Sequence, residues 1–474
     1  MFMKRFFEAK LAQASYLIGC PGAKAAVVID ANRDVDQYIK AAEAEGVRIT
    51  HVTETHIHAD YVSGSRELAA RTGAQLLLSD EGDADWKYTF AAEAGATLLK
   101  DGDRFTVGAV HIDVVHTPGH TPEHLAFLVT DSAAATEPIA IVSGDFIFVG
   151  DVGRPDLLEK AAKVAGTMEI GARTLYGSLR KADHWPDWLQ IWPGHGAGSS
   201  CGKGISAIPH STLGYERRFN WAFQVKTEQE FVSAVLSGQP DPPKYFAEMK
   251  RVNKVGPRLL HGFNRPELLQ VNRLESALAA GALVIDTRSA AAFAAGHVPG
   301  TINIPLNASF TTWAGWLVPY TQDFYLITED TSGAMVDMAV RDLAMIGLDQ
   351  IAGWFDAGVI DSWAEGERPL GTVPQITARD LQASLSHNAV TLVDVRNDGE
   401  WASGRIDGAI HIPLGVVADR APEIPTSKPI VVQCAAGARS SIAASLLKAR
   451  GIDNVINLVG GIGEWRKASL PTTS

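Results

Sequence analysis

Cysteine is scarce in this chain, which has only Cys20, Cys201 and Cys434 among 474 residues. Three thiols cannot build a disulfide framework, so we expect a reducing, cytoplasmic compartment. An excess of basic residues is also missing, and the net charge of -12 argues against a nucleic-acid partner. No apolar run approaches the length of a membrane helix, and the N-terminus lacks the apolar core and cleavage site of a signal peptide. We therefore expect no membrane partner either.

Two imidazoles and a carboxylate gather in the stretch Thr55-His56-Ile57-His58-Ala59-Asp60-Tyr61. The alternating run of residues 48–54 predicts a strand before this stretch, and residues 63–70 predict a loop that enters a helix. Imidazoles two residues apart on such a loop can converge on one ion, whereas on a regular strand they would point to opposite faces. The stretch therefore indicates half of a metal site, with two surface histidines as the alternative.

Single ligand-type residues follow two later predicted strands. His120 lies in Thr117-Pro118-Gly119-His120-Thr121, and Asp145 lies in Val142-Ser143-Gly144-Asp145. In this order and spacing the three motifs resemble the His-x-His-x-Asp, Gly-His and Gly-Asp signature of the metallo-β-lactamase superfamily. The resemblance implies a four-layer αββα sandwich. Asp30, which ends another predicted strand, either supports a ligand histidine or serves as a helix cap or turn residue.

The residue after Asp60 bears on the metal. Hydrolases of this superfamily usually hold two zinc ions and need a histidine there, whereas this chain has Tyr61. His56, His120 and Asp145 remain as a set of two histidines and one carboxylate, which suits non-haem iron(II) and dioxygen. Persulfide dioxygenases of the superfamily use these three positions, and residues 146–156 resemble their segment after the aspartate. The resemblance implies one Fe(II) per chain.

Other polar residues around these motifs allow more than one role. His58 and His195 are zinc ligands in the hydrolases, and beside a single iron they and Asp60 would support the ligands or face the substrate. Arg154 resembles an arginine near the substrate of the dioxygenases, where it would hold an anionic sulfur product or a carboxylate of the thiol carrier. A surface salt bridge is the alternative. Cys201 either packs as a structural thiol or passes a persulfide toward the iron.

An internal repeat organises the second half of the chain. Residues 284–305 recur as residues 393–413, with an aspartate, an arginine, two glycines and a proline in register. Two tandem α/β modules follow from this repeat, and Gly256-Pro257 indicates a boundary before them. We predict domains at residues 1–255, 262–368 and 372–474.

The second copy of the repeat contains a strand, a small-residue loop and a helix at residues 429–449. Backbone amides at such a helix N-terminus bind anions and favour a thiolate, with a cysteine pKa of roughly 3.5 to 7.5. The loop resembles the Cys-x-x-Gly-x-Arg loop of rhodanese sulfurtransferases, which implies that Cys434 is the nucleophile and that Arg439 steers sulfite or thiosulfate. A buried cysteine that ends a core strand is the alternative. The predicted substrate-binding residues are Ala435, Ala436, Gly437 and Ala438.

The first copy lacks this chemistry. Alignment by its glycine places Asp330 opposite Cys434 and Met335 opposite Arg439. We therefore expect a rhodanese-like fold without transferase activity, which serves as a spacer, a docking surface or an oligomer interface.

The whole chain resembles fusions of a persulfide dioxygenase, an inactive rhodanese-like domain and an active rhodanese. The resemblance implies that O2 oxidises a low-molecular-weight persulfide, of glutathione, coenzyme A or a similar thiol, to sulfite in sulfide detoxification. Sulfur transfer through Cys434 would then give thiosulfate, and the tether would raise the effective concentration of sulfite. We expect a homo-oligomer. The alternatives are a zinc thioester hydrolase of the glyoxalase II kind fused to a sulfurtransferase, and a sulfur-carrier scaffold.

Overall fold

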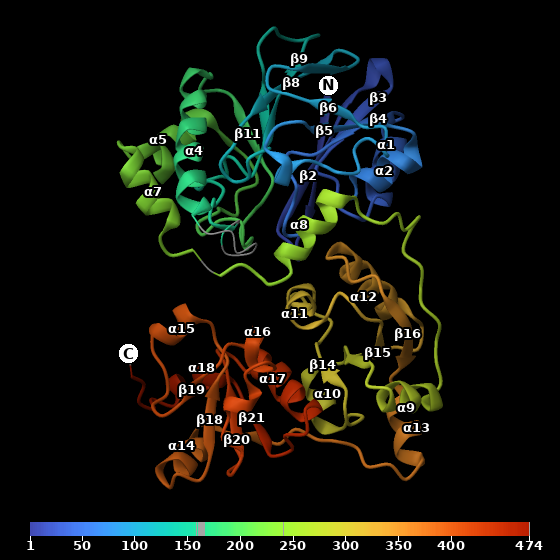
Figure 1. Cartoon of the computed structure of the whole chain (residues 1–474), viewed down its shortest axis with the longest axis vertical. Helices are drawn as coiled ribbons and strands as arrows, with labels where there is room; N and C mark the ends of the chain where they lie inside the picture. The colour runs from blue at the N-terminus through green and yellow to red at the C-terminus, as the bar shows by residue number, and fades with distance from the viewer. Residues whose placement is uncertain (158, 160–165, 240, 474) are drawn as a thin grey trace. The chain divides into compact units, whose positions relative to one another are not determined.

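The computed structural model describes residues 1–157, 159, 166–239 and 241–473, which form two compact units (Figure 1). The first unit comprises residues 1–263 with 344–347, and the second comprises residues 264–343 with 348–474. Each unit has its own sheets and hydrophobic clusters. Within the described residues, no helix combines the length and the apolar character that a membrane crossing requires.

Two six-stranded sheets form the centre of the first unit, with the orders β1-β2-β3-β4-β5-β6 and β12-β11-β10-β9-β8-β7. The strands of the first sheet are β1 (Phe2–Glu8), β2 (Gln13–Cys20), β3 (Ala25–Ile29), β4 (Arg48–Thr53), β5 (Gln75–Ser79) and β6 (Thr97–Leu99). Those of the second are β7 (Arg104–Val107), β8 (Val110–His116), β9 (Leu125–Asp131), β10 (Ala140–Gly144), β11 (Gln190–Pro193) and β12 (Ser211–Thr212).

Alternating side chains of these strands fill two different layers. Tyr16 and Val27 point between the sheets toward Phe127, whereas Leu17 and Val28 point to the outer face. The helices α1 (Asp36–Ala44) and α2 (Ser65–Thr72) cover that outer face, and α4 (Thr167–Lys181) and α7 (Glu228–Leu236) cover the second sheet. The predicted αββα sandwich is confirmed. Further helices are α5 (Leu213–Phe219), α6 (Trp221–Gln224) and α8 (Phe246–Val255).

The second unit contains two parallel sheets, one for each copy of the repeat, with the orders β14-β13-β15-β16 and β17-β21-β20-β18-β19. The first module has β13 (Leu283–Asp286), β14 (Ile302–Asn303), β15 (Phe324–Thr328) and β16 (Ile351–Asp356), with α9 (Val271–Ala279), α10 (Ala290–Ala295), α11 (Phe310–Leu317), α12 (Ala334–Met345) and α13 (Gly358–Glu365). The second has β17 (Gln375–Ile376), β18 (Thr391–Asp394), β19 (Ile410–His411), β20 (Ile430–Gln433) and β21 (Val455–Leu458), with α14 (Ala378–Ser386), α15 (Asp398–Ala402), α16 (Leu414–Val417), α17 (Ala438–Ala449) and α18 (Gly461–Lys467).

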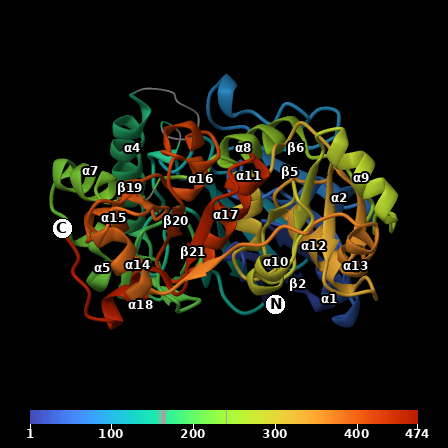
Figure 2. The same ribbon diagram turned by 90° about the horizontal axis from the view of Figure 1, so that it is seen from below.

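The two modules of the second unit pack against each other through α17, which lies against β14 and α10 (Figure 1); Figure 2 shows α17 and α10 from below. The backbone N–H of Asn303 on β14 donates to the Ser445 hydroxyl of α17 at 2.9 Å. The middle of α17, residues 440–447, is buried as a consequence, since one of its faces covers its own sheet and another meets the neighbouring module. The predicted pair of tandem α/β modules is confirmed.

Candidate metal centre and anion-binding loop

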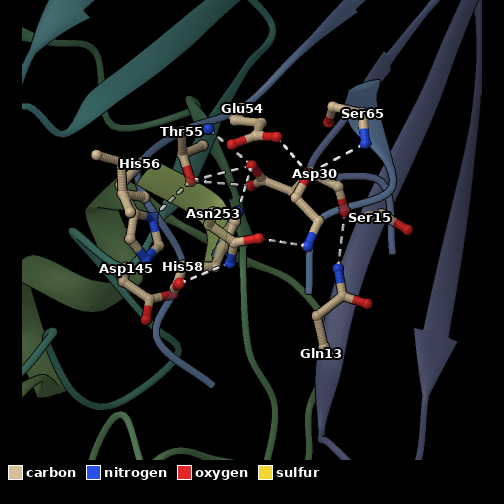
Figure 3. A network of polar contacts seen from close by, with 12 residues as sticks. Gln13, Ser15, Asp30, Glu54, Thr55, His56, His58, Ser65, Asp145 and Asn253 are labelled. Carbon is tan, nitrogen blue, oxygen red and sulfur yellow. Dashed lines mark hydrogen bonds and ion pairs between the residues drawn. The ribbon is translucent and has the colours of Figure 1, made fainter. Parts of the chain in front are cut away.

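The three predicted metal ligands come together in the first unit, at ends of its central strands. His56 follows β4, His120 lies between β8 and β9, and Asp145 directly follows β10. One ligand atom from each lies within 4.8 Å of the others, and all three side chains are buried. Figure 3 shows Asp145 next to the His56 ring, with Thr55 between His56 and Asp30. Strands from both sheets end here, so residues far apart in the sequence meet at one point.

A hydrogen-bond chain fixes the orientation of His56. Thr55 donates its backbone N–H to Asp30 Oδ1 at 2.7 Å and its hydroxyl to Asp30 Oδ2 at 3.0 Å. The Thr55 hydroxyl therefore accepts from His56 Nδ1, 2.9 Å away, which leaves Nε2 as the lone-pair nitrogen. Burial and then the neighbouring imidazoles lower the pKa of His56 well below its usual value, so the ring is neutral. Of the two roles considered for Asp30, the structure favours support of a ligand histidine.

His120 and Asp145 are held in a similar way. His120 Nδ1 donates to the Arg154 carbonyl at 3.0 Å, and its Nε2 lies 3.4 Å from Asp145 Oδ2. Asp145 Oδ1 accepts from His195 Nδ1 at 2.7 Å, whereas its buried Oδ2 has no hydrogen-bond donor in the described part of the protein. Burial alone would raise the pKa of Asp145, but the adjacent His195 and His120 lower it, so the group is a carboxylate. Two neutral imidazole nitrogens and an unsatisfied carboxylate oxygen fit a divalent transition metal.

His58, the second imidazole of the stretch, is not part of this converging set, although its ring centroid lies 4.2 Å from that of His56. Its Nε2 pairs with Asp30 Oδ1 at 3.1 Å, and its ring packs against Tyr61 with a centroid distance of 4.5 Å. Burial lowers the pKa of His58, but Asp30 outweighs this effect and the net shift is upward. The Tyr61 hydroxyl donates to the Asp30 carbonyl at 3.3 Å. Tyr61 thus fills space beside His58 and offers no imidazole to a second metal.

Helix α8 holds the loop of residues 55–63, which carries the His-x-His-x-Asp motif, although α8 lies far from it in the sequence. Asn253 donates its side-chain amide to the carbonyls of His58 at 2.8 Å and Tyr61 at 2.7 Å, and accepts from the Ser63 backbone N–H at 2.9 Å (Figure 3). These bonds satisfy backbone groups that a buried, irregular loop would otherwise leave unpaired. Asn253 lies almost 200 positions from the loop, so no local pattern could have indicated it.

A second group of possible ligands, Asp60, His195 and Cys201, lies beside the first, again with ligand atoms within 4.8 Å of one another. His195 Nε2 donates to Asp60 Oδ2 at 2.7 Å, so this ring bridges Asp60 and Asp145. Burial opposes protonation of His195, but the two carboxylates raise its pKa well above the usual value. Burial, followed by the same carboxylates, raises the pKa of Cys201, which favours a thiol over the more nucleophilic thiolate.

Arg154 is completely buried, so the alternative of a surface salt bridge is wrong. Its Nε and Nη2 donate to the two carboxylate oxygens of Asp156 at 2.7 Å each, and its Nη1 donates to the Ser200 carbonyl at 3.0 Å. Its backbone N–H donates to the Cys201 carbonyl at 3.3 Å, while its own carbonyl accepts from His120. Arg154 thus ties the loop of a metal ligand to the segment that carries Cys201.

His124 belongs to the site, although the sequence motifs did not single it out. Its Nε2 accepts from the Asp145 backbone N–H at 3.0 Å, and its Nδ1 donates to the Thr117 hydroxyl at 2.8 Å. Its ring stacks on His56 with a centroid distance of 5.1 Å. Burial, then the nearby imidazoles, lower the pKa of His124 to about 3, so it remains a neutral acceptor. The only sequence signal was a histidine four residues after His120.

In the second unit, Cys434 directly follows β20 and lies in a loop of small residues before α17. Its sulfur accepts from the Gly437 N–H at 3.1 Å and from the Ser440 hydroxyl at 3.5 Å. The loop packs closely on Gly461, where a Cβ would lie 2.1 Å from the Cys434 carbonyl oxygen. The Gly437 N–H, the Ser440 hydroxyl and the positive end of the α17 dipole thus lie at the sulfur, which stabilises negative charge there. Arg439, on the first turn of α17, pairs with Glu400 of α15.

The strand register corrects the alignment of the first module with the second. Asp286 pairs with Ile327 where Asp394 pairs with Gln433, so Thr328 and not Asp330 corresponds to Cys434. Seven positions separate Ile327 from the start of α12, whereas five separate Gln433 from the start of α17, so the first loop is two residues longer. Gly333 still precedes its helix, which is why a glycine-based alignment conceals the insertion. The absence of a thiol is unaffected, since Thr328 replaces it.

The longer loop supplies its own anion to the helix N-terminus. The Asp330 carboxylate accepts from the backbone N–H groups of Ala334 at 3.0 Å and Met335 at 3.3 Å. The Ser332 hydroxyl, followed by these amides, lowers the pKa of Asp330, although burial opposes the shift. The Asp330 carboxylate therefore occupies the N-terminal amides of α12, which would bind an external anion if the loop carried no such side chain.

Comparisons with known proteins agree with the fold of both units. Residues 10–195 match the metallo-beta-lactamase superfamily, and residues 270–359 and 377–468 match the rhodanese-like domain. A crystal structure of a metallo-beta-lactamase from Staphylococcus aureus subsp. aureus COL is 45% identical with a TM-score of 0.68, over 75% of this chain and 99% of that one. The similarity therefore extends from the first unit into the second.

Each curated relative matches only part of the chain. The mitochondrial persulfide dioxygenase ETHE1 of Bos taurus is 28% identical over 50% of this chain and 80% of its own length. A sulfurtransferase of Allochromatium vinosum is 37% identical over 21% of this chain and 94% of its own length. Bacterial hydroxyacylglutathione hydrolases also match, one of them, from Rhodospirillum rubrum, with 30% identity over 38% of this chain and 60% of its own length. The chain belongs to the metallo-β-lactamase superfamily in its first unit, and two tandem rhodanese-like domains follow.

Proposed function

We propose that the first unit oxidises a low-molecular-weight persulfide with O2, using one Fe(II) per chain, and that Cys434 in the second unit transfers sulfur. The observation that carries the proposal is the convergence of His56, His120 and Asp145. Nδ1 of each imidazole and Oδ1 of Asp145 are hydrogen-bonded to the protein, whereas Asp145 Oδ2 has no hydrogen-bond donor among the described residues. A relative named persulfide dioxygenase supports the proposed oxidation, and a relative named sulfurtransferase supports the proposed sulfur transfer. Physiological carriers of the persulfide in this proposal are glutathione, coenzyme A or a similar thiol.

Fe(II) would be held by His56, His120 and Asp145, and when bound it supplies the activation of dioxygen. Persulfide, O2 and water give thiol, sulfite and two protons, so the outer sulfur is oxidised and its S–S bond breaks. Burial keeps both ligand imidazoles neutral, while Thr55 and the Arg154 carbonyl hold their Nδ1 atoms so that each Nε2 is presented to the metal. His195 holds protons on both ring nitrogens between Asp60 and Asp145. His58, Asp60 and His195 therefore act by orienting the ligands and by holding charge.

Sulfur transfer follows from the loop of the second rhodanese-like domain. The Cys434 thiolate attacks the outer sulfur of a persulfide, the S–S bond of the donor breaks, and the carrier thiol leaves. Sulfite then attacks the outer sulfur on Cys434, which gives thiosulfate and restores the thiolate. The Gly437 N–H and the Ser440 hydroxyl stabilise the charge on Cys434, while the amides of residues 435–438 and Arg439 receive the anionic substrate.

The proposal also covers the domain limits, the cellular location and the role of the middle domain. We place the domain limits at 1–255, 262–368 and 372–474, and assign no transferase activity to the middle domain because it contains no cysteine. All three cysteines are free thiols, which supports a reducing, cytoplasmic location. The middle domain would serve as a spacer, a docking surface or the contact of a homo-oligomer.

The test uses the full chain purified without oxygen. About one iron per chain is expected, with O2 uptake on a low-molecular-weight persulfide that is lost in His56→Ala, His120→Ala and Asp145→Ala. Cys434→Ser should retain O2 uptake but release sulfite where the wild type forms thiosulfate, because the hydroxyl is not a nucleophile for sulfane sulfur at neutral pH. Cys20→Ser is the matched control and should leave the product ratio unchanged. An iron-loaded wild type without O2 uptake would refute the dioxygenase proposal, and an unchanged ratio in Cys434→Ser would refute the coupling.

A zinc thioester hydrolase is the second candidate, because Asp60, His195 and Cys201 form a further group of metal-ligand residues and hydroxyacylglutathione hydrolases are among the relatives. Tyr61 argues against it, since its hydroxyl is directed at the Asp30 carbonyl where the hydrolases have a histidine. Metal analysis separates the two candidates. Two tightly bound zinc ions per chain together with thioester hydrolysis would favour the hydrolase.

A further inference from the structure

The two rhodanese-like domains provide an internal comparison between contacts that serve the fold and contacts that serve the reaction. Arg396 Nη2 pairs with Asp394 Oδ2 at 2.6 Å, and the equivalent Arg288 Nη2 pairs with Asp286 Oδ2 at 2.7 Å. Each arginine also donates to the carbonyl of a glycine eight residues later, at 2.9 Å in both domains. Because this buried arrangement is the same in the domain without a thiol, it belongs to the fold.

A second ion pair of the thiol-bearing domain does not recur. Glu400 lies six positions after Asp394, and the residue six positions after Asp286 is Ala292. Its partner Arg439 is the second residue of α17, and the second residue of α12 is Met335. Both members of the pair are thus missing from the domain that lacks the nucleophile. Their joint absence, beside the retained Asp–Arg pair, indicates that the Glu400–Arg439 ion pair serves the reaction.

The geometry of the pair is well defined. Arg439 Nη1 and Nη2 donate to Glu400 Oε2 and Oε1, both at 2.6 Å, and the two side chains are 21% and 32% exposed. Two of the five guanidinium N–H groups are thereby used. The pairing with Glu400, against the effect of burial, raises the pKa of Arg439, and the nearby Cys434 adds to that shift. Arg439 therefore lies within electrostatic reach of the nucleophile.

Glu400 is itself firmly held. Its backbone N–H donates to the Asn397 side chain at 2.8 Å and its Oε2 accepts from the Asn397 N–H at 3.2 Å, which forms a capping box at the start of α15. Its carbonyl accepts from Arg396 Nη1 at 3.0 Å. The Asn397 N–H thus holds the Glu400 carboxylate and the buried Arg396 holds the Glu400 backbone, so the Arg439 guanidinium has a well-positioned acceptor.

We propose that Glu400 is a positioning residue for sulfur transfer, which holds Arg439 so that its remaining N–H groups meet the anionic substrate at the Cys434 loop. The inference rests on the proposed transfer activity of Cys434. An unrestrained arginine would have to be ordered each time thiosulfate or sulfite binds, and Glu400 removes that cost in advance. The negative charge of Glu400 opposes an anion only weakly, because the pair is partly exposed and screened.

Steady-state thiosulfate:cyanide transfer by the full chain tests the proposal. Glu400→Gln keeps an acceptor for the capping box but removes the charge, and Glu400→Ala removes both. We expect the KM for thiosulfate to rise about 3- to 10-fold in both variants, the range for ordering one long side chain on binding, with a much smaller change in kcat. Alkylation of Cys434 by uncharged iodoacetamide, followed by mass spectrometry, should proceed at the wild-type rate because the loop itself is intact.

Two controls separate positioning from general effects. Glu423→Gln removes a similar ion pair with Arg420 on the surface of the same domain, at 2.7 Å, and should leave the KM unchanged. In an Arg439→Ala background, Glu400→Gln should cause no further loss, because its effect acts through Arg439. A KM that stays the same or falls in the Glu400 variants, or that rises equally in Glu423→Gln, would overturn the inference. A wild type without any transfer would instead remove the proposed function of Cys434.

Discussion

Thr55→Val is expected to weaken metal binding without touching a metal ligand. The substitution keeps the branched shape of the side chain and the backbone N–H bond to Asp30, but it removes the hydroxyl that accepts from His56 Nδ1. The buried ring N–H then loses its partner, and the ring is no longer confined to the tautomer that presents Nε2. Because Thr55 also donates to Asp30, the change disconnects His56 from the carboxylate that orients it.

Two independent estimates give the size of this effect. Loss of a partner that orients a metal-binding histidine reduces metal affinity about 10- to 100-fold, which corresponds to about 1.4–2.8 kcal/mol. A buried donor left without an acceptor costs about 1–3 kcal/mol. The two ranges agree, so we expect the dissociation constant for Fe(II) to rise by one to two orders of magnitude, roughly the range given by the first estimate.

Anaerobic titration with Fe(II) against a chromophoric competing chelator measures this change. Thr50→Val is a matched control, because Thr50 makes the same kind of hydroxyl contact with His51 Nδ1, also at 2.9 Å, on the strand that leads to the site. The control should bind Fe(II) as the wild type does. Equal affinities in Thr55→Val and Thr50→Val would show that the Asp30–Thr55 chain does not orient His56, and the reasoning would be wrong.

Three further changes have defined outcomes. Asp156→Ala removes the carboxylate that pairs with the buried Arg154, so the unfolding free energy of the first unit should fall by about 3–5 kcal/mol in urea denaturation, whereas Asp183→Ala, at a surface pair, should have little effect. Burial lowers the pKa of His297, so the unfolded state takes up a proton at a higher pH than the folded state. The stability of the second unit should therefore fall as the pH decreases below about 6.5. His297→Gln should flatten this dependence of stability on pH, and an unchanged slope would contradict the prediction. Asp330→Ala should lower the unfolding free energy by about 1 kcal/mol, because two N-terminal amides of α12 lose their acceptor, and an unchanged thermal midpoint would speak against this role.

The sequence by itself was sufficient for the fold class and for the positions of the main motifs. Periodicity placed His56, Asp145 and Cys434 at strand ends, because alternation and turn residues are local properties of the chain. The repeat predicted two tandem modules for the same reason, since aspartate, arginine and glycine recur in register. The retained Asp394–Arg396 and Asp286–Arg288 pairs give the physical basis of that signal.

Only the tertiary structure decided which atoms meet. Three contacts join elements that are distant in sequence. Asp30 binds Thr55, which orients His56; the Asp145 backbone N–H donates to His124; and Asn253 donates to the His58 carbonyl. The correspondence of Thr328 with Cys434 likewise required the strand register, because a glycine before a helix recurs wherever the loop turns, whatever its length. Local patterns determine where a strand ends and which residue type follows it. Packing of the sheets determines which of those ends share a site.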